Sequence, residues 1–164
     1  MREGDEERVA VHEAGHAVAY LVMGRPIDRA IVTRTEHQVD PVIGTRIDMT
    51  DEAVAMAAGW AAEERRFRLA GMAADQLDTE WLNGGHHDDR AMLEALASKV
   101  DAVNVSEAES RAEQLVGEHW ELILALSAKL LEASTVDQDQ LEALGALHGV
   151  DFGQGFRWLP SEPG

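Results

Sequence analysis

The sequence predicts a mainly helical domain with a small β portion, an α+β fold built from 164 residues. Apolar residues recur at helical spacing over most of the chain. A stretch near residues 27–47 is instead rich in β-branched residues and contains turn residues. Hydrophobic residues make up 45% of the sequence and charged residues 27%, which is ordinary for a chain that buries a core.

The expected elements follow one another with short connections. A first helix covers about residues 5–23 and ends before Gly24 and Pro26. A β-hairpin or two short edge strands follow within residues 27–47. Further helices are expected at about residues 50–70, 88–100, 106–131 and 135–147.

Capping residues place two of the helix starts. Thr50 precedes two acidic residues and is expected to cap the second helix. Ser106 and Glu109 have the spacing of a capping box, which predicts one long helix from Ser106 to about Leu131. Residues 1–150 are expected to form a single domain, and the glycine- and proline-containing residues 151–164 an irregular tail.

The first helix carries two histidines, His12 and His16, with Glu13 directly after the first. Residues four apart lie on one face of a helix, so both imidazoles can reach one metal ion. Glu13 is placed to take a proton from a metal-bound water, which is the content of the HExxH signature of zinc peptidases. The surrounding residues are small and apolar, and polar groups in a buried helix need partners.

A catalytic zinc site usually takes three protein ligands and a water, so a third ligand is needed. The chain has no cysteine, which leaves histidine and carboxylates. One candidate group is Asp88 or Asp89 after the turn at residues 84–85; the other is Glu63 or Glu64 on the second helix. Helix capping and a solvated helix face are the ordinary roles of such residues, and spacing alone does not choose between the two groups.

Three segments, in order, resemble the peptidase domain of the FtsH family, the membrane-anchored ATP-dependent zinc proteases. They are residues 11–17 (VHEAGHA), 59–64 (GWAAEE) and 84–88 (GGHHD). The C-terminal helical part is also similar, so the resemblance covers about residues 9–147. Trp60 stands where the family usually has arginine, and Asp89 where it has an apolar residue.

The resemblance implies a zincin-like helical domain that binds Zn²⁺ through His12, His16 and Asp88, with Glu13 as the catalytic base. A shift of one residue in the glycine turn would make Asp89 the ligand instead, and neighbouring helical side chains point about 100° apart, so only one of the two can bind. Glu63 is then expected to orient a ligand histidine.

The expected function is therefore that of a zinc metalloendopeptidase acting on unfolded or small peptide substrates. An edge strand within residues 27–47 could pair with an extended peptide, although a plain structural hairpin is an equal reading. The alternative is a non-catalytic binding or regulatory module with a structural zinc, in which His86 or His87 supplies a fourth ligand. An intact Glu13 favours the enzyme.

The family's other modules are not found in the sequence. It contains no G-x-x-x-x-G-K-[ST] phosphate loop and no apolar run of about 20 residues, and its first eight residues lack the apolar core of a signal peptide. We expect a cytoplasmic protein that does not bind membranes. Two partners are possible: a separate ATPase that acts in trans, and further copies of the same chain in a homo-oligomer. The net charge of −17 argues against nucleic acid as a partner.

Overall fold

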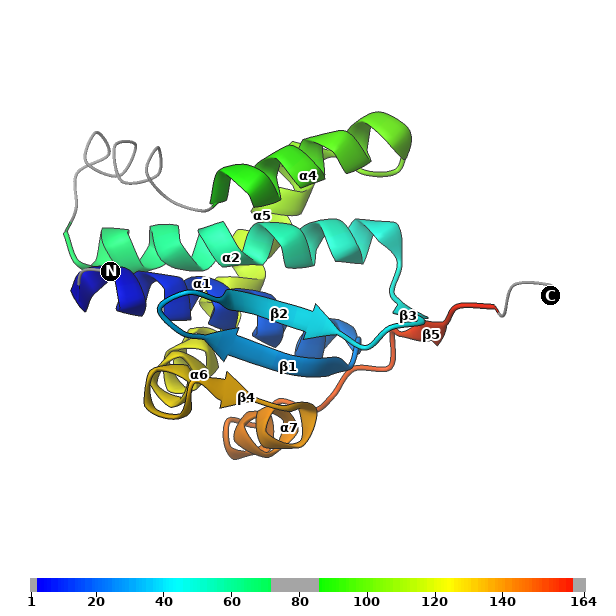
Figure 1. The fold of residues 1–164 in the computed structure, drawn as a ribbon. Coiled ribbons are helices and arrows are strands. Elements are labelled where there is room, and N and C mark those ends of the chain that lie inside the picture. The colour runs from blue at the N-terminus through cyan, green and yellow to red at the C-terminus, as the bar shows by residue number, and fades with distance from the viewer. Residues whose placement is uncertain (1–2, 72–85, 161–164) are drawn as a thin grey trace.

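The computed structural model describes residues 3–71 and 86–160, with side chains at residues 5–71 and 89–160. In this part of the chain the fold is mainly helical with a few short antiparallel strands, which confirms the predicted class (Figure 1). None of the described helices is long and apolar enough to cross a lipid bilayer.

Helix α1 (Glu3–Met23) lies at the centre of the molecule, with the other elements around it (Figure 1). From Val9 to Leu21 nearly every residue is buried, on all sides of the helix. Its neighbours are α2 (Met49–Leu69), α6 (Trp120–Ala133) and strand β1 (Ile27–Val32). A helix that is apolar all round is stable only inside such a shell.

Helices α1 and α2 run side by side and approach closely because small residues face each other. Gly15 of α1 lies against the backbone of α2, where an added Cβ would be 2.5 Å from the carbonyl oxygen of Ala58. The α2 surface at this contact consists largely of buried alanines. The glycine therefore offsets its poor helix propensity by allowing the two backbones to meet.

The predicted hairpin is present. Strand β1 pairs antiparallel with β2 (His37–Pro41), with Ala30 opposite Val39. A third strand, β4 (Thr135–Val136), pairs with the other edge of β1, so the order is β2-β1-β4 and β2 is an outer strand. The sequence predicts a helix from residue 135, but residues 135–136 form this strand; a two-residue strand has no periodicity to detect.

The C-terminal tail is more ordered than expected. Strand β5 (Arg157–Trp158) pairs with β3 (Thr45–Arg46), and the backbone N–H of Gly153 donates to the carbonyl of Leu21. Two phenylalanines of the tail pack against the core. The remaining described residues of the tail are irregular, as predicted.

The long helix expected from Ser106 to Leu131 is instead two helices, α5 (Val105–Glu118) and α6, which meet at His119. The break allows α5 to pack on α2 while α6 packs on α1. The capping residue of α5 is Asn104, which accepts from the N–H of Glu107 at 3.0 Å, so the predicted box at Ser106 was wrong by two residues.

The other caps lie close to their predicted positions. Asp48, rather than Thr50, caps α2 and accepts from the N–H of Thr50 at 2.9 Å. Helix α7 (Gln138–Leu147) begins at Asp137 with a complete capping box. Helix α4 (His86–Lys99) packs on α2, on the upper side of the α1–α2 pair in Figure 1.

Candidate metal centre

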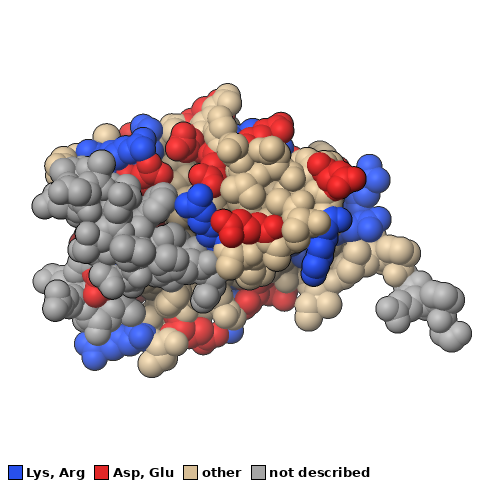
Figure 2. Space-filling view, turned by 90° about the horizontal axis from the view of Figure 1, so that it is seen from above, with Lys and Arg blue, Asp and Glu red and all other residues tan. Residues whose placement is uncertain are grey.

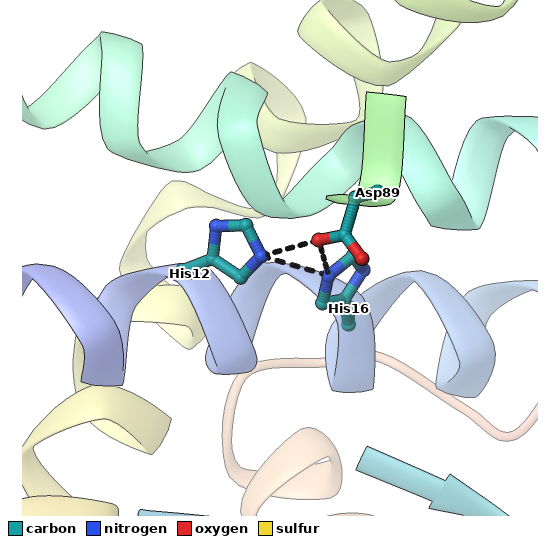
Figure 3. A group of neighbouring side chains, drawn as sticks. All are labelled: His12, His16 and Asp89. Carbon is teal, nitrogen blue, oxygen red and sulfur yellow. Dashed lines mark hydrogen bonds and ion pairs between the residues drawn. The ribbon is translucent and has the colours of Figure 1, made fainter. Parts of the chain in front are cut away.

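His12 and His16 lie one turn apart on α1 and point to the same side, toward α2 and α4 (Figure 3). Their Nε2 atoms are 3.0 Å apart, and the two rings meet edge to face. The spacing of four residues therefore brings both imidazoles to one point, as the sequence predicts. His12 is buried and His16 is partly exposed.

The third member of the group is Asp89, near the start of α4 (Figure 3). Its Oδ2 atom lies 2.7 Å from Nε2 of His12 and 3.1 Å from Nε2 of His16. Asp88, the residue that the resemblance implied, belongs to α4, but its side chain lies outside the described residues. The structure thus brings together His12, His16 and the alternative aspartate, Asp89.

The second nitrogen of each ring is held by a neighbour on α2. Nδ1 of His16 donates to the carbonyl oxygen of Ala55 at 2.8 Å. Nδ1 of His12 is hydrogen-bonded to the carboxylate of Glu63, which is buried and lies 3.5 Å from Arg8. Because Nδ1 carries the proton, the neutral ring presents the Nε2 lone pair to the shared point.

The three groups form an arrangement that requires a cation. Lone pairs of two nitrogens and one carboxylate oxygen face one point, and they repel unless a proton or a metal ion lies among them. Burial alone would lower the pKa of His12, but hydrogen bonds to Asp89 and Glu63 raise it to about 10. Burial would raise the pKa of Asp89, but the two histidines hold it far below its usual range.

The donor set fits zinc. Two imidazole nitrogens and a carboxylate are ordinary zinc ligands, and tetrahedral bonds of about 2.0 Å separate two ligand atoms by about 3.3 Å. The three separations, from 2.7 to 3.1 Å, are slightly shorter than this value. A small outward movement of the side chains would accommodate the ion.

Gly59 of α2 makes the room in which the two imidazoles meet. A Cβ at this position would lie 2.5 Å from Nε2 of His16 and 2.7 Å from Nε2 of His12. Any other residue would therefore displace the atoms that face the metal position. The segment at residues 59–64 contributes twice to the site, through this glycine and through Glu63.

Glu13 lines the same cavity, which has a volume of about 350 Å³. Its side chain is buried, and its Oε1 atom lies 3.4 Å from Nδ1 of His37 on β2. The sequence analysis missed His37, because a lone histidine in a hairpin, 24 positions after Glu13, has no spacing that indicates a contact. The sequence feature that could have indicated His37 is its place in the predicted hairpin, which directly follows the HExxH helix.

The remaining sequence candidates lie elsewhere or outside the described part. Glu64 forms an ion pair with Arg68 on α2 and does not line the cavity of the histidines. Its side chain is only 14% exposed, so the expected solvated helix face was wrong for this residue. The side chains of His86 and His87, considered as fourth ligands, lie outside the described residues. Within the described part, the group of potential metal ligands has three members.

The charge distribution on the surface indicates less about function than the cavity does. On the face seen in Figure 2, acidic and basic side chains are interspersed among neutral ones. No protein-family model matches the chain, and no curated protein matches it either. The features that bear on function are the group of His12, His16 and Asp89, and Glu13 beside it.

Proposed function

We propose that the chain is a zinc-dependent metallopeptidase with His12, His16 and Asp89 as ligands and Glu13 as the general base. The observation that carries this proposal is the convergence of the three donor atoms in a cavity that Glu13 also lines. The three-segment resemblance to the FtsH-type peptidase domain is consistent with this function.

Each side chain then has a defined part in peptide hydrolysis. A zinc ion in this site would polarise the scissile carbonyl and lower the pKa of its bound water toward 7. Glu13 accepts the proton of the attacking water and delivers it to the leaving amine. Glu63 and the Ala55 carbonyl hold the two imidazoles in the tautomer that leaves Nε2 to the metal.

Strand β2 is the proposed binding site for the peptide substrate. It is an outer strand of the three-stranded sheet, and His37, Gln38 and Val39 line the same cavity as Glu13. An extended peptide could add to this edge through main-chain hydrogen bonds, which would carry it past the metal position. The substrates proposed are unfolded or small peptides, with an ATPase in trans as one means of supplying longer chains.

The enzyme reading is tested by metal analysis and by one substitution. Protein purified without chelator should contain about one zinc per chain. Glu13→Gln should slow the cleavage of casein and of short peptides by about 10²–10⁴-fold while the zinc content stays the same, because the amide cannot act as a base. The variant Glu64→Gln, whose ion-pair partner is Arg68, is the matched control and should keep full activity. Purified protein without zinc would count against the whole proposal.

The competing reading is a binding module with a structural zinc. The two readings differ in the fourth coordination position, which holds water in an enzyme and a protein side chain in a structural site. X-ray absorption of the zinc-loaded protein would count the histidine ligands. Two histidines would support the enzyme, and three would support the structural site, with His86 or His87 as the fourth ligand.

A further inference from the structure

The carboxylate of Glu13 is held in an unusual way. Its side chain is only 6% exposed, and a carboxylate at such a depth normally needs hydrogen-bond donors. One oxygen, Oε1, has Nδ1 of His37 at 3.4 Å. The other oxygen, Oε2, forms no hydrogen bond within the described part of the chain. Oε1 of the base is thus hydrogen-bonded to His37, and Oε2 is available to accept a proton.

His37 reaches Glu13 from a different element. It is the first residue of β2 and pairs in register with Val32 of β1, so the sheet fixes its backbone beside α1. Its side chain is 45% exposed. Its Nε2 atom forms no hydrogen bond with any described residue. The ring therefore contacts the buried base on one side and is exposed to solvent on the other.

Two other donors that line the cavity, Arg8 and Tyr20, are directed at different carboxylates. Arg8 lies against Glu63 at 3.5 Å, and the hydroxyl of Tyr20 donates to Glu52 at 2.7 Å. His37 is therefore the donor that faces Glu13 among the described residues. Its 3.4 Å separation is at the long end for a hydrogen bond, and catalytic hydrogen bonds are often long before substrate binds.

We propose that His37 is a positioning residue for the peptidase reaction: its ring donates a hydrogen bond to Oε1 of Glu13 and so orients Oε2 toward the water. This inference rests on the proposed function and goes beyond the HExxH site, because the residue comes from the hairpin. It also links substrate binding on β2 to the orientation of the base, since the strand that would receive the peptide carries the ring.

The electrostatics of the pair agree with this geometry. The Glu13 carboxylate raises the pKa of His37 above its ordinary value, against the opposing effects of burial and of His12 and Arg8 on α1. A larger fraction of the ring is then protonated near neutral pH, and a protonated imidazole can donate from either nitrogen. Nδ1 can thus donate to Glu13 in the resting site.

The kinetic test uses the full-length, zinc-loaded protein. His37→Ala should lower kcat by roughly 10–100-fold with little change in KM and no loss of zinc, because the base is present but poorly oriented. His37→Gln should recover part of this loss, since its amide N–H can still donate. His148→Ala, at the C-terminus of α7, is the matched control and should leave kcat unchanged.

A double variant separates positioning from a structural effect. If His37 acts through Glu13, then Glu13→Gln combined with His37→Ala should be no slower than Glu13→Gln alone, because the two residues form one unit. Additive losses would contradict a shared role. A kcat for His37→Ala equal to that of the wild-type protein would overturn the inference outright.

A second readout does not depend on activity. The pKa of His37 in the zinc-loaded protein can be followed by ¹H–¹⁵N NMR of the imidazole, with His37→Gln to assign the signal. It should lie above about 6.5 in the wild-type protein and fall toward this value in Glu13→Gln. An unchanged pKa in Glu13→Gln would show that the two side chains do not interact. If no peptide is cleaved but this shift is present, the proposed function fails while the contact stands.

Discussion

The two halves of the site differ in how deeply they are anchored. The inner half consists of His12 and Glu63, whose side chains are 8% and 3% exposed on the packed helices α1 and α2. The outer half consists of Asp89 on α4 and His37 on β2, which are 29% and 45% exposed. The inner half is buried beside the core, and the outer half belongs to elements that lie over it.

This difference indicates which substitutions should change the free energy of unfolding as well as zinc binding. A change in the inner half disturbs the helix contact and the metal position together, because the same close packing produces both. A change in the outer half removes one group and leaves the core intact. Substitutions at Gly59, Asp89 and Glu63 test this division, beginning with the largest expected effect on zinc binding.

Gly59→Ala should abolish zinc binding and lower the free energy of unfolding of the metal-free protein by about 1–3 kcal/mol. The added Cβ would occupy space within 2.7 Å of both imidazoles. Zinc titration and thermal unfolding measure the two effects. Gly117→Ala on α5 is the control, because a Cβ there meets its nearest neighbour, Arg65, at an ordinary 3.6 Å. A zinc-binding Gly59→Ala protein would mean that α2 is not close to the metal position.

Asp89→Asn should weaken zinc binding by more than about 100-fold, beyond the range usual for residues that only support a ligand. The core should be unaffected, so the unfolding temperature of the metal-free protein should change little. Asp88→Asn is the control and should bind zinc normally. If Asp88→Asn loses zinc and Asp89→Asn does not, the ligand is the residue that the family resemblance implied.

Glu63→Gln should have the smallest effect of the three, a loss of about 10–100-fold in zinc affinity. The amide oxygen can still accept from Nδ1 of His12, but the negative charge that increases the basicity of the ring is lost. Glu64→Gln, whose partner is Arg68 and not a histidine, should bind zinc as the wild-type protein does. Equal effects of the two variants would show that burial beside His12 has no special role.

The sequence was sufficient where one element carries the whole pattern. His12, Glu13 and His16 belong to a single helix, and helical periodicity alone places the two imidazoles together. The hairpin near residues 27–47 and the first two helices were predicted for the same reason, since each has a local pattern of several residues. The predicted role of Glu63 came from the family resemblance, and the contact with His12 agrees with it.

Local patterns failed where a neighbour decided the outcome. A helix over residues 106–131 satisfies local propensity, but α5 and α6 pack on different helices and the chain breaks at His119. The short strands β4 and β5 exist because β1 and β3 offer edges to pair with. Their sequences contain no signal, because a two-residue strand is defined by its partner.

The sequence by itself determined which groups are available: two imidazoles one turn apart, a carboxylate beside the first, and no cysteine to form a thiolate metal site. Tertiary structure decided which groups join them. The packing of α4 on α2 brings Asp89 to the histidines, and the pairing of β2 with β1 places His37 beside Glu13. Neither choice is local, because the orientation of a side chain toward a distant residue depends on how whole elements pack.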